Sequence, residues 1–534
     1  MALIAVDLTP MMPGGENGGV KILTLELLRA FQDTAAEHRF LLLTAFWNHD
    51  ELAHLETPIM SRFMILDKPE GRVVFSNRIR GPAGRILRRV LLFFRRKMSR
   101  IDQAQRQPLS SRGVDLLFCP FTAPAYAEPG IPVVSVIHDM QHKDYPQFFP
   151  EKEIEIRDLF MADVRSGAAR IVCISENVRD AVLRYLGADP AGTHVVYNCI
   201  HSRLGADIPD ETRKAVTHRL GVHKRPYMFY PANFWPHKNH RMLLAAYGIF
   251  HHRHPGAAPD LVFTGALEEE QRLLMYVAKV MGIREHVHFL GFLTQEDLDL
   301  VLQESLFLVF PSLYEGFGIP VLEAMSLGKP VVCSNVTSLP EVAGDAALFF
   351  DPRKPVEMAD AMAKITLDPA LAADLTNLGK KRADLFRKEE MVGKYLNIFQ
   401  DVLGSQAIFK QGIAGVFDDG WTKGEISVVC GPGEEGRYLK VLLVVSPELP
   451  GGKRKISVFR NGKRILNKRF KKGDEQAISV PVPPSGEEFL ISISPLFQPS
   501  AHGMGLDHHN LGVICRSCAL VSPNGEKTSL LNRP

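Results

Sequence analysis

The feature that most limits what this sequence can fold into is an alternation of short apolar runs with helix-length amphipathic segments, which occurs in two rounds. In the first round, strand-like runs fall at residues 2–6, 40–43, 114–118, 133–137, 171–174 and 194–197. After a polar stretch at 202–225, further runs fall at 227–230, 261–264, 287–290, 306–310, 330–333 and 347–350. Strands separated by helices pair in parallel through right-handed crossovers. The sequence therefore predicts an α/β fold of two Rossmann-like, doubly wound domains that face each other across a cleft.

The pattern changes after about residue 403, where Gly, Pro and short alternating runs become frequent. Asn461-Gly462 lies between two strand-like halves, which is a strong signal for a β-hairpin. We therefore expect a separate all-β module, a sandwich or a jelly roll. The predicted domains are residues 1–205, 206–403 and 404–534.

Bulk composition excludes several classes of protein. A formal net charge of +3 over 534 residues does not suggest a nucleic-acid binder. The N-terminus lacks the features of a signal peptide, and no run reaches the roughly 18 apolar residues that span a bilayer. The seven cysteines lie mostly in apolar runs, so we expect buried thiols and assign the lone Cys515-x-x-Cys518 pair a structural role. These observations predict a cytoplasmic protein.

Residues 315–323 form the most informative motif. An apolar strand ends at Pro311, a loop carries Glu315-Gly316-Phe317-Gly318, and Pro320 fits the start of a helix. Free amides at a helix N-terminus attract anions, and glycines allow a ligand to approach the backbone closely. Glu315 and Glu323 flank this anion site. Carboxylates repel phosphate but accept hydrogen bonds from sugar hydroxyls, so we favour a diphospho-sugar site over simple compensation of the helix dipole.

Two further segments place polar residues at strand ends. Lys238 precedes a helix that Asn239 is expected to cap, so its charge can stabilise a diphosphate leaving group. The alternative is an exposed loop lysine. His138 and Asp139 follow the run at 133–137, and Asp139 is placed to orient the imidazole. A strand-end histidine can also be a capping or packing group.

A glycine-rich loop follows the first predicted strand. It contains Gly14, Gly15, Gly18 and Gly19, and Lys21 lies just beyond it. Surface loops are often glycine-rich. The position directly after strand one nevertheless favours a contact with donor phosphate, with Lys21 as a further candidate.

Over roughly residues 1–400, these motifs resemble the Glu-x7-Glu signature and glycine loop of the retaining glycosyltransferases of family 4, which have the GT-B fold. The resemblance implies that Glu315 contacts the transferred sugar and Glu323 the ribose, with His138 near the sugar. It also implies that the Gly316 and Phe317 amides, beside Gly318, line the sugar-diphosphate. The first domain would then hold the acceptor and the second the nucleotide sugar.

The chain departs from the family at one position. The family usually has an Arg five residues before the lysine, whereas this chain has Asn233. Leaving-group stabilisation then rests on Lys238 alone or on a basic residue from elsewhere. No Asp-x-Asp pair accompanies the site, so we expect no metal and no cofactor beyond the nucleotide-sugar substrate. The resemblance implies retention of configuration, and we expect the transferred sugar to be a hexose. A sugar-nucleotide epimerase and a catalytically silent carbohydrate-binding subunit are the alternatives.

Residues 71–100 contain ten Lys or Arg and no acidic residue. On a helical wheel one face is basic, and it carries Arg85, Arg88, Arg89, Arg95, Arg96 and Arg100. Such a helix suits an anionic membrane surface and would make the protein peripheral, with a glycan or lipid-linked acceptor. A helix that packs its apolar face on its own domain is an equal alternative.

Overall fold

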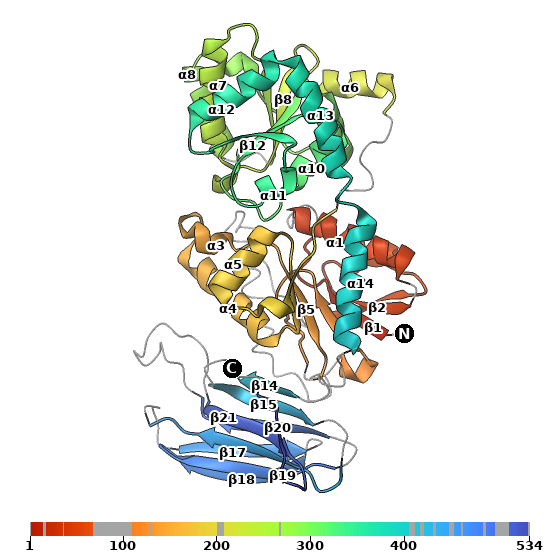
Figure 1. Ribbon diagram of the computed structural model, residues 1–534, viewed down its shortest axis with the longest axis vertical. Coiled ribbons are helices and arrows are strands. Elements are labelled where there is room, and N and C mark those ends of the chain that lie inside the picture. Colours follow the sequence, from red (N-terminus) through yellow and green to blue (C-terminus); the bar gives the residue numbers. More distant parts are fainter. Residues whose placement is uncertain are drawn as a thin grey trace.

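The computed structural model describes residues 2–13, 18–35, 37–67, 109–128, 130–199, 208–265, 269–404, 412–416, 421–430, 434–447, 453–460, 463–483, 487–496 and 512–531. Two α/β domains and a β module follow one another along the long axis of the molecule (Figure 1). The predicted fold class is confirmed. The basic stretch at residues 71–100 and the loop residues Gly14 and Gly15 lie outside the described residues.

The first domain contains a seven-stranded parallel sheet in the order β3-β2-β1-β4-β5-β6-β7. Its strands are nearly continuous apolar runs, as expected for a sheet covered by helices on both faces. The strands are β1 Ala2–Asp7, β2 His38–Ala45, β3 Met60–Leu66, β4 Leu116–Cys119, β5 Val133–Ile137, β6 Arg170–Cys173 and β7 Thr193–Val195. The helices are α1 Gly18–Thr34, α3 Gln141–Asp144, α4 Glu151–Gly167 and α5 Glu176–Leu186, and the 3-10 turns are η1 Glu51–Leu55, η3 Ser110–Arg112, η4 Pro146–Phe148 and η5 Pro190–Gly192.

The second domain contains a six-stranded parallel sheet in the order β10-β9-β8-β11-β12-β13. Its strands are β8 Tyr227–Pro231, β9 Asp260–Thr264, β10 Val287–Phe289, β11 Phe307–Phe310, β12 Val331–Ser334 and β13 Ala347–Phe350. Its helices are α6 Asp210–Leu220, α7 His240–Arg253, α8 Glu269–Val280, α9 Gln295–Glu304, α10 Ile319–Ser326, α11 Leu339–Ala343, α12 Pro355–Leu367 and α13 Pro369–Ala383, with the turns η6 Pro236–Lys238 and η7 Arg284–His286.

Both sheets reverse their strand order once, between β1 and β4 and between β8 and β11. In open α/β sheets, ligands bind beyond the carboxyl ends of the strands at such a switch point. The two rounds of apolar runs predicted twelve of these strands and missed β3. That strand contains an apolar run at residues 63–66, but it lies at the edge of its sheet and most of its side chains are only half-buried.

Helix α14 (Lys388–Gly404) follows the second domain in sequence but packs against the first. Its Phe399 ring lies 5.8 Å from Phe31 and 5.2 Å from Phe118. Figure 1 shows this helix running alongside the first domain beside α1. The chain therefore crosses between the α/β domains twice, which ties their spacing to the packing of α14. None of the helices in the described part of the chain is both long and apolar enough to cross a membrane.

The β module consists of two antiparallel sheets around a single apolar core. One sheet has the order β14-β15-β20-β17-β18 and the other β19-β16-β21-β22. The strands are β14 Gly412–Val416, β15 Thr422–Cys430, β16 Tyr438–Val444, β17 Lys453–Arg460, β18 Lys463–Lys471, β19 Glu475–Pro481, β20 Glu487–Ser494, β21 Ile514–Val521 and β22 Lys527–Ser529. Strands β17 and β18 pair as the predicted hairpin. The side chains of Cys515 and Cys518 are buried, as expected for thiols in apolar runs.

Candidate active site

The loop between β11 and α10 is held by the loop that follows the neighbouring strand β12. Thr337 Oγ1 accepts a hydrogen bond from the Glu315 amide at 3.1 Å. The buried Ser338 hydroxyl donates to the carbonyls of Glu315 at 3.0 Å and Phe317 at 2.9 Å. These contacts fix the backbone on both sides of Gly316, so the loop is preorganised for a ligand.

Glu315 forms an ion pair with Lys238. Lys238 Nζ lies 2.5 Å from Glu315 Oε1, and the two side chains are only 16% and 12% exposed. The partners come from loops after β8 and β11, the two strands at the switch point. A charge-assisted hydrogen bond that is largely shielded from water is strong, and it brings the predicted cation and the predicted sugar-binding carboxylate together.

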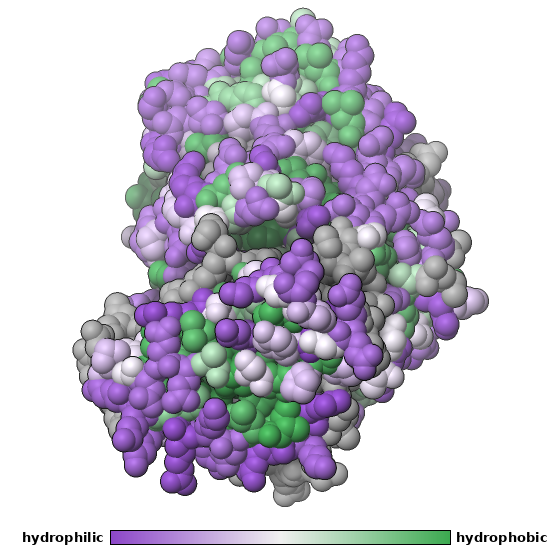
Figure 2. Space-filling view, turned by 60° about the horizontal axis from the view of Figure 1, so that its bottom comes forward, coloured by the Kyte–Doolittle hydropathy of each residue, from purple (hydrophilic) through white to green (hydrophobic). Residues whose placement is uncertain are grey.

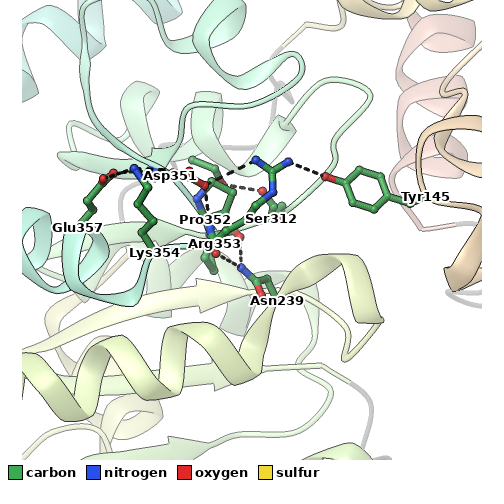
Figure 3. Close-up of polar contacts among 10 residues, drawn as sticks. Tyr145, Asn239, Ser312, Asp351, Pro352, Arg353, Lys354 and Glu357 are labelled. Atoms are coloured by element: carbon green, nitrogen blue, oxygen red, sulfur yellow. Dashed lines mark hydrogen bonds and ion pairs between the residues drawn. The ribbon is translucent and has the colours of Figure 1, made fainter.

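The residue after Lys238 does not act as predicted. Asn239 precedes α7, but its side chain makes no capping hydrogen bond. Its φ of 61° is left-handed, whereas a capping residue needs an extended backbone. Asn239 Nδ2 instead donates to the carbonyls of Pro311 at 3.0 Å and Pro352 at 2.8 Å (Figure 3). Asn239 therefore joins the ends of three strands, β8, β11 and β13, and so positions the Lys238 loop.

The histidines on either side of Lys238 are neutral at physiological pH. Burial lowers the pKa of His237 to about 2, with a smaller contribution from the Lys238 charge. Burial also lowers the pKa of His240 to about 3. Asn233 is exposed and uncharged. Positive charge on the segment from residue 231 to 240 is therefore carried by Lys238.

Helix α10 provides the second part of the candidate donor site. Gly318 precedes it with a φ of 104°, a conformation that favours glycine. The Phe317 side chain is buried against Tyr197 and Phe386, at ring distances of 6.0 and 5.9 Å. Because its carbonyl accepts from Ser338, the group that Phe317 offers a ligand is its amide. Glu323 lies in the second turn of α10 and is half-buried.

On the first domain, His138 and Asp139 follow β5, but the imidazole takes a hydrogen-bond partner other than the predicted Asp139. His138 Nε2 donates to the carbonyl of Pro120 at 2.7 Å, and burial lowers the pKa of this imidazole. Asp139 Oδ1 accepts from the amide of Gln141 at 3.1 Å and lies 3.8 Å from Arg157. The Pro120 carbonyl therefore orients the His138 imidazole, because the Asp139 carboxylate interacts with the Gln141 amide and with Arg157.

The loop of residues 315–318, the candidate donor loop, lies directly against the first domain. Ser175 Oγ donates to the carbonyl of Gly316 at 2.8 Å, and a Cβ on Gly316 would lie 2.0 Å from the carbonyl oxygen of His138. The Tyr314 hydroxyl accepts from the amide of Met140 at 3.1 Å. The carboxyl ends of β5, β6 and β11 thus meet at this loop, and glycine is the residue that allows the approach.

Two more contacts join the domains around the site. The Glu341 carboxylate accepts from the amides of Glu176 at 2.6 Å and Asn177 at 3.1 Å, where it complements the positive end of α5. Arg353 reaches across to the Tyr145 hydroxyl at 3.3 Å (Figure 3). The second domain therefore contacts the first at the N-terminus of α5 and at the Tyr145 side chain.

The glycine loop is described only in part. Helix α1 begins at Gly18, and Gly19 has open space where a side chain would project. Lys21 is mostly buried, and its Nζ lies 2.5 Å from Glu51 and 3.0 Å from the carbonyl of Met12. Lys21 is therefore part of an ion pair within the first domain.

Sequence reasoning missed the residues that support the site. These are Ser175, Tyr314, Thr337, Ser338 and Glu341, all of which contact the loop or the opposite domain. One available signal was that residues 335–341 follow β12, and parallel strands end at the same edge of the sheet. The described residues contain no group of three or more His, Cys, Asp or Glu arranged to hold a metal ion.

Comparisons with known proteins agree with this architecture. Residues 17–204 match the family described as Glycosyltransferase Family 4, and residues 214–382 match Glycosyl transferases group 1. O-antigen chain mannosyltransferase B of Escherichia coli is 30% identical over 268 residues, which cover 50% of this chain and 70% of that protein.

Two solved structures share the fold. HepE of Anabaena, solved with UDP-glucose, covers 75% of this chain and 100% of its own at 18% identity and a TM-score of 0.55. WaaG, a glycosyltransferase involved in lipopolysaccharide biosynthesis, covers 74% of this chain and 99% of its own at 15% identity and a TM-score of 0.53. The matched regions, the mannosyltransferase relative and the two doubly wound sheets together show that the chain belongs to the GT-B glycosyltransferases.

Proposed function

We propose that this protein is a retaining glycosyltransferase that moves a hexose from a nucleotide-diphosphate sugar to a glycan or lipid-linked acceptor. The observation that carries the proposal is the shielded Lys238–Glu315 pair, 2.5 Å apart, beside the N-terminus of α10. The pair provides a cation that can bind a diphosphate and a carboxylate that can accept a hydrogen bond from a sugar hydroxyl. Relatives support the donor and acceptor classes, since one is an O-antigen mannosyltransferase and another was solved with UDP-glucose.

In this proposal the second domain holds the donor. The backbone amides of residues 316–318 and the ammonium of Lys238 bind the diphosphate, and Glu323 accepts hydrogen bonds from the ribose hydroxyls. Glu315 accepts from a hydroxyl of the transferred sugar. His138 and the glycine loop with Gly14, Gly15, Gly18 and Gly19 approach from the first domain.

The proposed reaction breaks the bond between the anomeric carbon and the diphosphate and forms a bond to the acceptor oxygen on the same face. The acceptor proton passes to an oxygen of the leaving diphosphate. Lys238 and the helix amides stabilise the developing charge, so we propose that no metal is required.

Transfer that persists at full rate in excess chelator is the expected result, and loss of transfer that Mg²⁺ or Mn²⁺ restores would contradict it.

A panel of nucleotide sugars in a thermal-shift assay tests the donor class, because a bound donor stabilises the folded state by mass action. The stabilising donor is then supplied in labelled form with candidate acceptors, and NMR reads the anomeric configuration of the product. Conversion of the donor to an epimer without transfer would identify the epimerase alternative. Glycan binding with no stabilising donor would identify a catalytically silent subunit.

Glu323→Ala should weaken donor binding about 10- to 100-fold, because the ribose hydroxyls would lose a charged acceptor worth about 1.5–3 kcal/mol. Calorimetric titration with the selected nucleotide sugar measures the change. The matched control is Glu285→Ala, which removes an exposed carboxylate from the same domain and should leave the Kd unchanged. Undiminished donor affinity in Glu323→Ala would contradict the ribose role.

The membrane prediction for the basic helix also enters this proposal. We propose that Arg85, Arg88, Arg96 and Arg100 hold the enzyme on an anionic membrane, where a lipid-linked acceptor would be found. Replacing these four arginines with glutamate should weaken binding to anionic vesicles. Unchanged binding would instead favour a helix packed on its own domain.

A further inference from the structure

The β17–β18 hairpin of the β module carries a concentration of positive charge that the glycosyl transfer site does not use. Residues 453–472 include ten Lys or Arg and no Asp or Glu, whereas the whole chain has a formal net charge of +3. Strand β18 is the outermost strand of its sheet. Of its nine residues, only Leu466 and Phe470 are not exposed. The lysines and arginines of β18 therefore project into solvent, whereas Arg454 on β17 is buried.

The pairing of the two strands places like charges opposite each other. Lys453 pairs with Lys471, and Lys455 pairs with Arg469, with all four residues exposed. Within the part of the chain that the structure describes, none of these four side chains takes part in a hydrogen bond or ion pair. Like charges directly opposite on neighbouring strands destabilise a sheet. The arrangement thus opposes folding of the module, which indicates that it serves another purpose.

Protection of a sheet edge does not account for these charges. Exposed edge strands often carry lysine, which prevents edge-to-edge pairing with another molecule. That explanation fits Arg469 and Lys471 on β18. It does not fit Lys453 and Lys455, because β17 lies inside the sheet between β20 and β18. The positive charge extends across two adjacent strands and so forms a surface rather than a protected edge.

The side chains on this surface indicate which class of anionic partner it can bind. Glycan-binding and single-stranded nucleic-acid surfaces present aromatic rings on which sugars or bases stack. Strands β17 and β18 contain no Trp or Tyr, and their Phe459 and Phe470 are half-buried and buried. The exposed side chains are long cations, joined by Ile465, which is 42% exposed. Figure 2, which brings this end of the molecule forward, shows hydrophilic residues over much of the β module beside a smaller hydrophobic patch.

We propose that the outer face of the β17–β18 hairpin, which carries Lys453, Lys455, Arg469 and Lys471, docks onto the surface of an anionic phospholipid bilayer. Lysine and arginine near such a surface are attracted by its negative potential, and their apolar stems can lie at the headgroup level. An exposed isoleucine among them adds apolar contact. The docking surface is separate from the donor site, and its assignment does not depend on the proposed transfer chemistry.

The test compares two double variants of the full chain in sedimentation with vesicles of phosphatidylcholine and phosphatidylglycerol. Lys455→Glu with Arg469→Glu reverses one opposed pair and retains its like-charge repulsion, so stability should change little. Lys440→Glu with Lys527→Glu makes the same change in net charge on exposed residues of the other sheet. We expect the first variant to lower the vesicle partition coefficient on the order of tenfold or more. The control should lower it much less.

Equal losses in the two variants would show that only total charge matters and would overturn the proposal. An unchanged partition coefficient in the first variant would overturn it too, as would tighter binding to double-stranded DNA than to vesicles at the same salt concentration. The single variant Lys455→Glu adds a structural check. It places opposite charges across the pair, so it should raise the unfolding midpoint while it weakens vesicle binding, and a residue kept for stability would not behave in this way.

Discussion

Replacing Lys238 with alanine should lower kcat/KM for glycosyl transfer by about 10²- to 10³-fold, the usual effect of removing one group that stabilises transition-state charge. Neutral His237 and His240 and the uncharged Asn233 leave Lys238 as the cation of its loop. The variant also leaves the shielded Glu315 carboxylate without its partner, at a cost to folding of about 1–3 kcal/mol. Steady-state kinetics with a saturating acceptor, beside thermal unfolding, separates the two effects.

Three further variants sharpen this prediction. Lys279→Ala removes an exposed lysine from α8 in the same domain and should leave kcat/KM unchanged. Lys238→Arg retains the charge and should retain more activity than alanine, although a planar guanidinium does not fit every ammonium site. Asn233→Arg supplies the residue that the family usually has, so it should restore part of the activity lost in Lys238→Ala. Wild-type kcat/KM in Lys238→Ala would refute the leaving-group role.

How much of this site could be predicted depends on how far apart in the sequence the interacting residues lie. The loop of residues 315–318 and helix α10 could be predicted because strand, glycines and proline lie within a few residues of one another. Parallel sheet order then brings Lys238 near Glu315, since β8 and β11 are neighbours although the residues are 77 positions apart. The sequence contains no comparable rule for Ser175 and Gly316, which lie 141 positions apart on different domains.

Local errors had local causes. Asn239 has the residue type and position of a helix cap, but its backbone is left-handed, so its side chain binds the carbonyls of Pro311 and Pro352 instead. The predicted hydrogen bond between His138 and Asp139 is absent from the described contacts because the imidazole binds the backbone carbonyl of Pro120 instead. Every residue has a backbone carbonyl, so residue type does not predict such a partner. Side-chain identity therefore predicted which groups gather at the site better than it predicted which partners they take.

Gly316→Ala should lower kcat/KM by about 10²-fold, an effect expected when reacting groups are displaced by about 1 Å. The added Cβ would lie 2.0 Å from the His138 carbonyl oxygen, a separation that real side chains essentially never show. Backbone on both sides must move, because Ser338 and Thr337 fix the loop and β5 fixes His138. The contact joins the donor loop to the opposite domain, so the displacement changes the loop, the spacing of the domains, or both.

The control for this substitution is Gly393→Ala in α14, where no atom lies within 4 Å of the new Cβ. Inside a helix this change should stabilise the protein by roughly 0.5–1 kcal/mol and leave kcat/KM unchanged. Small-angle scattering adds a second measurement, since domains forced apart should increase the radius of gyration of Gly316→Ala but not that of Gly393→Ala. If Gly316→Ala retains wild-type kcat/KM and compactness, the contact between the donor loop and His138 does not set the active geometry. If kcat/KM falls while the dimensions stay constant, the loop itself has moved, and the spacing of the domains is determined by α14 and Glu341.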